Sequence, residues 1–202
     1  MSRPLDTQAL LEAFEDIGKA ARRAGARLEF AVYGGSALML ASNFRFSSED
    51  VDIVVLEQPW PDWLGKAVAD LAAREGWRAD WLNDGVLFHL SPLATKQTDH
   101  VLFGTFPRDG GVPGLSVYVA SARYMLALKL KAIRVTEPLR GPQEASDILN
   151  LLRFLQIDTP EDAIAILATY FPASAASPEK QLFLLRHIQS IGGGVDEPRY
   201  IG

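Results

Sequence analysis

The pattern of apolar and polar residues divides the chain into a first half of mixed strands and helices and a second half of helices. Apolar residues at helical spacing predict helices, while continuous or alternating apolar runs predict strands. In the first half we expect helices at 6–24, 36–42 and 62–75, and strands at 28–33, 51–56, 77–82, 86–90, 100–104 and 115–120. In the second half we expect helices at 121–135, 144–156, 160–171 and 178–190, separated by prolines.

Several local features refine this outline. Ser36 and Ser121 are expected to cap the helices that follow them. The continuous apolar run at 51–56 predicts a strand that is buried on both faces. The sequence Asn-Asp-Gly at 83–85 predicts a hairpin, and the glycine-rich end at 192–202 is expected to be poorly ordered. The chain is therefore predicted to be α+β, with a mixed sheet and flanking helices in residues 1–120 and a helical bundle in residues 121–202.

Composition narrows the class of protein. The chain has 202 residues, of which 48% are hydrophobic and 22% charged, as in ordinary globular proteins. The net charge of −5 argues against a generally basic nucleic-acid-binding surface, and the absence of cysteine excludes disulfides, thiolate metal sites and cysteine nucleophiles. We expect no signal peptide and no membrane helix, since no apolar run approaches the roughly 20 residues needed, and hence a cytoplasmic protein.

Candidate chemistry lies in residues 33–55, which read YGGSALMLASNFRFSSEDVDIVV. Because strand side chains alternate, Asp50 and Asp52 are expected on one face. Two close carboxylates repel each other, and a divalent cation relieves that repulsion; Mg²⁺ prefers carboxylate and water oxygens. Glycines allow backbone N–H groups to approach a phosphate, and the following helix adds its positive end. The stretch therefore predicts a site for a nucleoside triphosphate (NTP) and metal.

The segments GGSAL and DVDIVV resemble the signature of the nucleotidyltransferase superfamily with the DNA polymerase β-like catalytic fold. They are most similar to its AbiEii-type branch, which includes nucleotidyltransferase toxins of toxin–antitoxin systems. That branch often has an arginine and then a serine or threonine before the first aspartate. Arg45 and Ser48 match these places, although the interval from arginine to aspartate is about one residue longer here.

The resemblance implies roles for individual residues. Gly34, Gly35 and Ser36 would contact the triphosphate, and Asp50 and Asp52 would bind Mg²⁺, with two ions in the site.

The superfamily adds a third catalytic and metal-binding carboxylate from a later strand. Asp99 is the candidate for it here, and an exposed aspartate at a strand start is the alternative.

A second candidate group lies in residues 121–140, which contain five basic residues and one acid. Lys129 has apolar helical neighbours, so it either reaches out to water or pairs with an anion. The segments LALKLKAIR and EASDILNLL are similar to AbiEii-type helices. That similarity implies that Lys129 contacts nucleotide phosphates, that Asp147 orients Lys129 or acts as a base, and that Arg134 holds phosphate or acceptor. Alternatively, Asp147 is a first-turn helix acid and Arg134 a surface residue.

These features predict a Mg²⁺-dependent nucleotidyltransferase that moves NMP from an NTP to a hydroxyl of RNA or protein. If it belongs with the toxins, a tRNA is the expected acceptor and a cognate antitoxin protein the expected partner. One alternative is a non-catalytic module of the same fold that binds a nucleotide or a partner. Another is an antibiotic-modifying nucleotidyltransferase, for which an acidic cleft would be expected.

Overall fold

The computed structural model describes residues 5–56, 59–133 and 141–201, and the chain divides into two compact units. Unit 1 consists of Met1–Ala41, Arg45–Phe88 and His100–Ala120. Unit 2 consists of Ser42–Phe44, His89–Asp99 and Ser121–Gly202.

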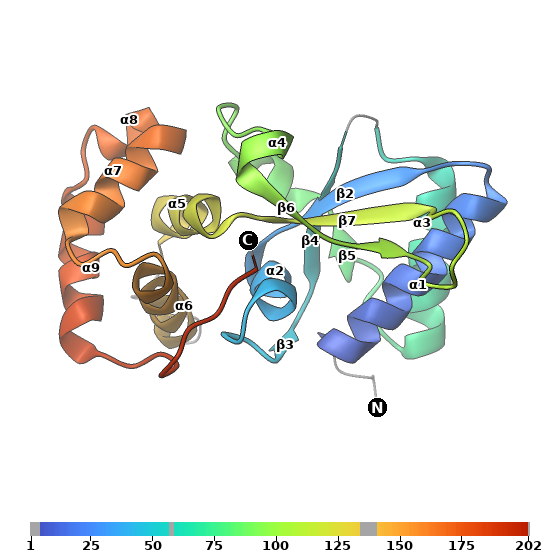
Figure 1. Ribbon diagram of the computed structural model, residues 1–202, viewed down its shortest axis with the longest axis horizontal. Coiled ribbons are helices and arrows are strands. Elements are labelled where there is room, and N and C mark those ends of the chain that lie inside the picture. Colours follow the sequence, from blue (N-terminus) through green and yellow to red (C-terminus); the bar gives the residue numbers. More distant parts are fainter. Residues whose placement is uncertain (1–4, 57–58, 134–140, 202) are drawn as a thin grey trace. The chain divides into compact units, whose positions relative to one another are not determined.

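Strands and the helices beside them make up unit 1 (Figure 1). Its strands are β1 (Leu5–Asp6), β2 (Leu28–Val32), β3 (Ser47–Ser48), β4 (Val51–Val55), β5 (Leu82–Asn83), β6 (His100–Phe106) and β7 (Leu115–Ala120). Its helices are α1 (Thr7–Arg23), α2 (Gly34–Ala41) and α3 (Asp62–Glu75), and the 3-10 turn η1 (Gly85–His89) ends at the unit boundary.

The described part of unit 1 contains a five-stranded mixed sheet in the order β5-β4-β2-β7-β6. Strand β2 runs antiparallel to β4 and parallel to β7, β4 is parallel to β5, and β6 is antiparallel to β7. A separate two-stranded sheet joins β1 to β3. The central strand β2 therefore lies between β4, which carries Asp52, and β7.

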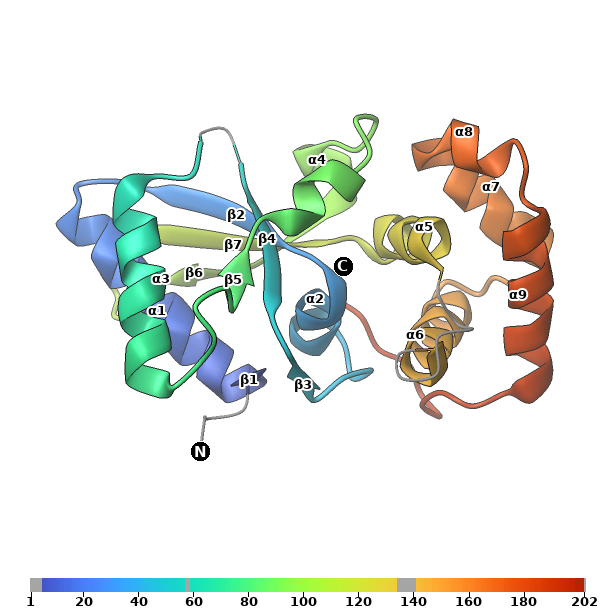
Figure 2. The same ribbon diagram turned by 180° about the vertical axis from the view of Figure 1, so that it is seen from behind.

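Helix α1 covers one face of the sheet, with α3 at its side (Figures 1 and 2). The apolar stripe of α1 includes Phe14. The centroid of the Phe14 ring lies 5.6 Å from that of Phe30 on β2 and 5.4 Å from that of Phe106 on β6. On the face of β4 that Phe30 shares, Val51 and Ile53 are buried, whereas Asp52 on the other face is only half-buried. The predicted burial of this strand on both faces is wrong, because one face of β4 remains partly open.

Helices make up most of unit 2. They are α4 (Lys96–Asp99), α5 (Ala122–Ala132), α6 (Gly141–Phe154), α7 (Pro160–Tyr170), α8 (Pro172–Ala175) and α9 (Glu179–Ile191). Helix α5 packs against α6 and α7, and α9 packs against α6 and α7, around buried leucines and isoleucines. The α+β class, with a mixed sheet followed by helices, is thus confirmed. Within the described residues no helix is long and apolar enough to cross a membrane.

The C-terminal segment after α9 is held in place, so the expectation of a poorly ordered tail is wrong. Asn43 accepts a hydrogen bond from the Arg199 N–H and donates one to the Glu197 carbonyl, both at 2.9 Å. Asn150 accepts from the Val195 N–H at 2.8 Å. Tyr200 bridges to Ser42 and is almost fully buried. Both asparagines are far from the tail in sequence, so a local sequence pattern could not predict these contacts.

Burial raises the pKa of the Tyr200 hydroxyl above its ordinary value of 10.0. Below pH 10 both folded and unfolded chains keep this proton, so its contribution to stability is fully present. As the pH rises above 10 the unfolded chain ionises first, and we expect the free energy of unfolding to fall by about 1.4 kcal/mol per pH unit from this group. Guanidinium unfolding between pH 9 and about 11.5 measures the slope, and Tyr200→Phe should lose this part of it. Equal slopes in the two proteins would contradict the assignment.

Candidate functional site

The Gly-Gly-Ser turn and the second aspartate meet in unit 1. Helix α2 begins at Gly34, directly after β2, and Gly34 has a positive φ of 64°. A Cβ placed on Gly34 would lie 3.1 Å from the Asp52 carboxylate oxygen Oδ2. The N–H groups in the first turn of a helix have no acceptor within the helix, and they carry its positive end. The Asp52 carboxylate therefore lies against the helix end that the sequence predicts to bind phosphate.

Gly34→Ala tests this close approach, and Gly25→Ala is its matched control. Both glycines have a φ of 64°, but no atom lies within 4 Å of a Cβ placed on Gly25. The positive φ alone is expected to cost each variant about 1–2 kcal/mol in the free energy of unfolding. Only Gly34→Ala crowds Asp52, so only this variant is expected to lose affinity for Mn²⁺ with nucleotide. Equal metal affinity in the two folded variants would show that the approach is irrelevant to the site.

The next two residues of the turn contact the loop that leads to β4. A Cβ on Gly35 would lie 2.7 Å from Nη1 of Arg45 and 3.3 Å from Oγ of Ser48. The Ser36 hydroxyl donates to the Asp50 carbonyl, as does the Ser48 hydroxyl at 2.8 Å. Ser36 thus does not cap α2, because the helix begins two residues earlier. Its hydroxyl instead fixes the backbone just before β4.

Asp50 precedes the first residue of β4 and is exposed. The pKa of Arg78 is raised above its ordinary value, mainly by the hydrogen bond that Arg78 donates to Asp80. The negative charges of Asp50 and Glu49 raise it further. Arg78 is thus a cation that interacts with the charge of Asp50. Arg78 lies in a predicted strand that is followed by a turn, and this sequence context gives no signal of the interaction.

Asn83 is a second residue that the sequence does not single out. It pairs with Asp52 in the parallel register of β5 and β4, so the two residues share a face of the sheet. Its Oδ1 accepts a hydrogen bond from the Gly85 N–H at 3.0 Å. An amide oxygen therefore lies on the strand next to the candidate metal-binding carboxylate.

The residues of this site fit a magnesium ion that is shared with a nucleotide. Mg²⁺ is held in proteins by one or two carboxylates, with substrate phosphates and water in the remaining positions. Asp52 and Asp50 would supply the carboxylates, and Gly34, which has no side chain, lets the Asp52 carboxylate lie close to the turn. In the described part of the chain no three His, Asp or Glu side chains form a group that could hold a metal alone. Two carboxylates with the remaining positions open to phosphate and water are the donor set expected for a metal–nucleotide complex.

Asp99 ends α4 and belongs to a hydrogen-bonded group within unit 2. Its Oδ1 accepts from the Tyr170 hydroxyl, and its Oδ2 accepts from the Thr95 N–H and the Thr98 hydroxyl, all at 2.7 Å. The residue is buried, so the alternative of an exposed strand-start aspartate is wrong. A role as the third metal-binding carboxylate stays a prediction.

Asp99→Asn is expected to lower the free energy of unfolding by about 1–3 kcal/mol, because the amide cannot accept all three hydrogen bonds and leaves a buried donor without a partner. Tyr170→Phe, which removes only one of the three, should cost less. Urea unfolding of both variants gives the comparison, and an unchanged stability of Asp99→Asn would contradict it. Mn²⁺ affinity of the folded Asp99→Asn protein tests the metal role separately.

Lys129 and Asp147 form an ion pair within unit 2, with Nζ 2.8 Å from Oδ2. The Asp147 side chain is 0% exposed and that of Lys129 13% exposed. Helix α6 begins at Gly141, so Asp147 is not a first-turn acid, and that alternative is wrong. Lys131, on the same helix as Lys129, donates to the His89 carbonyl at 2.9 Å. Two of the basic residues of α5 are therefore engaged inside unit 2.

Two predictions about the second group stay open. Lys129 and Asp147 belong to unit 2 and the aspartate pair to unit 1, so a common site remains a prediction. Arg134, expected to hold phosphate or acceptor, lies outside the described residues.

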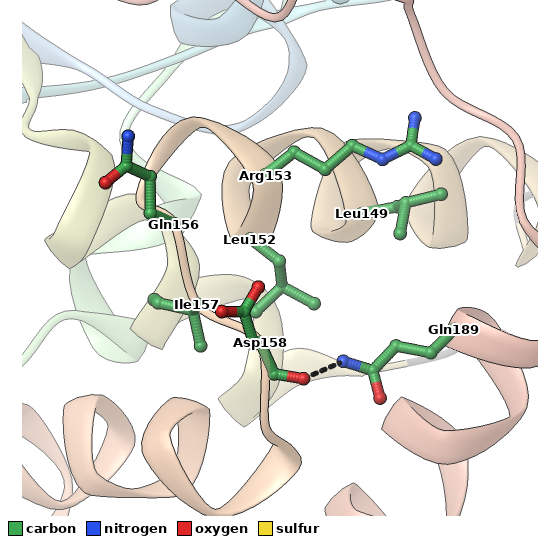
Figure 3. Close-up of a pocket in the computed structure, with 7 residues that line it drawn as sticks. All are labelled: Leu149, Leu152, Arg153, Gln156, Ile157, Asp158 and Gln189. Atoms are coloured by element: carbon green, nitrogen blue, oxygen red, sulfur yellow. Dashed lines mark hydrogen bonds between the residues drawn. The ribbon is translucent and has the colours of Figure 1, made fainter.

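A pocket of about 540 Å³ lies in unit 2 between the end of α6 and α9 (Figure 3). The amide of Gln189 donates to the Asp158 carbonyl at 3.2 Å across it. The Arg153 guanidinium points away from Asp158 and donates to the Gly193 carbonyl at 2.6 Å. None of the predicted site residues lines this pocket, which includes the apolar side chains of Leu149 and Leu152.

Comparison with known proteins shows a distant structural likeness. No protein-family model and no curated protein matches the sequence. Among solved structures, the chain is similar to an antigenic nucleotidyltransferase-like protein from Paracoccidioides brasiliensis, with 13% identity over 86% of this chain and 94% of that one. The TM-score is 0.38, so the likeness in backbone course is slight. The α+β class rests on the sheet and helices of this chain itself.

Proposed function

We propose that the protein is a Mg²⁺-dependent nucleotidyltransferase that transfers NMP from an NTP to a hydroxyl group. The observation that supports this proposal is the approach of Asp52 to Gly34, the first residue of α2: the carboxylate oxygen Oδ2 lies 3.1 Å from where a Cβ on Gly34 would stand. Metal and triphosphate would then be bound together, with Asp50 as the second carboxylate. The resemblance of GGSAL and DVDIVV to the superfamily signature supports the same chemistry.

The residues of the site have separable tasks in this reaction. The acceptor oxygen forms a bond to the α-phosphorus, the bond from that phosphorus to the bridging oxygen breaks, and pyrophosphate leaves with the electron pair. Asp52 and Asp50 would hold Mg²⁺, which would neutralise the phosphate charge and favour loss of the acceptor hydroxyl proton to water. Arg45 lies beside Gly35, where its guanidinium would contact the same phosphates. Ser36 and Ser48 hold the Asp50 backbone and so keep the aspartates next to α2.

The acceptor is proposed to be an RNA or protein hydroxyl, following the similarity to the AbiEii-type branch. In that case tRNA is the first acceptor to test, and a cognate antitoxin would be the protein that restrains the activity. Lys129 is proposed to bind phosphate and Asp147 to orient it, as the similarity of their segments to AbiEii-type helices implies.

The test is transfer of label from each α-³²P-labelled NTP in turn, with Mg²⁺, to total RNA, purified tRNA or cell protein. Labelled RNA or protein that depends on Mg²⁺ supports the proposal and identifies the acceptor class. If no NTP is bound and no label is transferred, the proposal fails.

A non-catalytic nucleotide-binding module is the second candidate, and the hydrogen bonds of Asp99 favour it. Its hydrogen bonds with Thr95, Thr98 and Tyr170 lie inside unit 2, as expected for a structural residue. Equilibrium binding of Mg²⁺ with an NTP, without transfer to any acceptor, would identify this function.

A further inference from the structure

One row of residues crosses the whole described sheet of unit 1 on a single face. Asn83 pairs with Asp52, and His100 pairs with Ala120. One step beyond the register of Val32, Tyr33 falls between Asp52 of β4 and Ala120 of β7. The Tyr33 N–H donates to the Asp52 carbonyl at 2.9 Å, as this register requires.

The Tyr33 ring extends along this row away from Asp52. Its hydroxyl is 2.7 Å from Nε2 of His100, two strands away on β6. The residue between them is Ala120, whose small side chain leaves room for the ring to cross β7. The two rings are nearly perpendicular, at 88° and with centroids 5.8 Å apart. The hydrogen bond therefore fixes the direction of the ring toward β6.

That direction matters because Tyr33 is the direct neighbour of both Asp52 and Gly34. Residues opposite each other in an antiparallel pair have Cβ atoms only about 5 Å apart, so a tyrosine ring can reach across its neighbour. A change of side-chain rotamer would swing the ring from β7 toward β4. The ring would then lie over Asp52, in the space that a metal and phosphate need.

We propose, on the basis of the proposed function, that Tyr33 and His100 are positioning residues that keep the ring out of the metal–nucleotide site. Tyr33 is 2% exposed, and its buried hydroxyl requires a hydrogen-bond partner. His100 supplies that partner from the opposite edge of the sheet. The pair acts through Asp52 and touches neither the metal nor the nucleotide.

The experiment measures Mn²⁺ affinity of the full chain by electron paramagnetic resonance, with the α,β-methylene analogue of each NTP. His100→Ala breaks the hydrogen bond and keeps the Tyr33 ring, and Tyr33→Phe breaks it from the other side. Each is expected to weaken Mn²⁺–nucleotide binding by about three- to tenfold, the size of one hydrogen bond. The double variant should be no weaker than either single variant, because both remove the same bond.

Two further variants distinguish positioning from general stability. His100→Gln places an amide near the former Nε2 and is expected to restore binding to within about twofold of the native protein. His187→Ala, an exposed histidine on α9, is the matched control and should bind as the native protein does. Thermal unfolding of each variant confirms that the folded proteins are being compared.

The outcomes separate this inference from the proposed function. If Asp52→Asn abolishes Mn²⁺–nucleotide binding but His100→Ala and Tyr33→Phe bind like the native protein, the positioning role is overturned and the proposed function stands. If the native protein does not bind Mn²⁺ with any nucleotide, both fail. Weakened binding in His100→Ala with recovery in His100→Gln supports the positioning role.

Discussion

Asp52→Asn is expected to reduce nucleotide transfer by at least about a hundredfold while leaving the fold intact. The amide has the shape of the carboxylate but carries no charge, so it weakens the hold on Mg²⁺ and on the charge that develops during transfer. Asp52 is half-buried in β4 and approaches Gly34, so the loss is expected at the turn that is proposed to bind phosphate. Steady-state transfer of label from the preferred NTP measures the change.

Asp70→Asn is the matched control for that experiment. Asp70 is an exposed residue of α3 in unit 1 whose carboxylate pairs with Lys66 at 2.8 Å. The substitution removes the same charge from the same unit, and we expect transfer to remain within about twofold, since exposed ion pairs of this kind contribute little. Comparable activity of Asp52→Asn and the native protein would exclude Asp52 as a metal ligand.

Asp147→Ala is expected to destabilise the protein by about 3–5 kcal/mol. The carboxylate is fully buried and pairs with Lys129, so its removal leaves an ammonium group without its partner in an apolar environment. Gln143, which donates to the other carboxylate oxygen at 3.4 Å, loses an acceptor as well. Urea unfolding followed by circular dichroism gives the difference in free energy.

The double variant Lys129→Met/Asp147→Leu is the control for this loss. Replacing a buried ion pair by apolar residues of similar volume is often neutral or stabilising, so the double variant should recover most of the stability. If Asp147→Ala unfolds at the same urea concentration as the native protein, the pair is not structural. Transfer activity of the stable double variant then shows whether Lys129 also serves the nucleotide, since a purely structural pair would leave activity unchanged.

The helices could be predicted closely because their signals are local. The apolar stripe of residues 6–24 gives α1, and Ser121 caps α5 by accepting from the Tyr124 N–H. Prolines separate α6, α7 and α9 near the expected places. Each of these features depends on residues within one or two turns, and such residues are visible in sequence.

Strand pairing was harder to predict, as Asn83 shows. The Asn-Asp-Gly sequence forms a turn in which the Asn83 side chain accepts the Gly85 N–H. Leu82–Asn83 then pairs in parallel with β4, and Gly85–His89 is a 3-10 turn. The predicted hairpin is therefore wrong, because a side chain satisfied the backbone locally and the partner strand lay elsewhere in the chain.

Some features of the candidate site could likewise be predicted from the sequence, whereas others depend on the tertiary structure. The sequence by itself determined the types of residue and their order: a glycine turn, a helix start and two aspartates on a following strand. The short interval between them makes their meeting nearly unavoidable once β2 and β4 pair as antiparallel neighbours. Only the tertiary structure decided that Asp99 accepts from Tyr170, that Asp147 holds Lys129 and that Tyr33 reaches His100. These contacts join residues 18 to 71 positions apart, and such pairings depend on how whole elements pack, which no local pattern of the chain encodes.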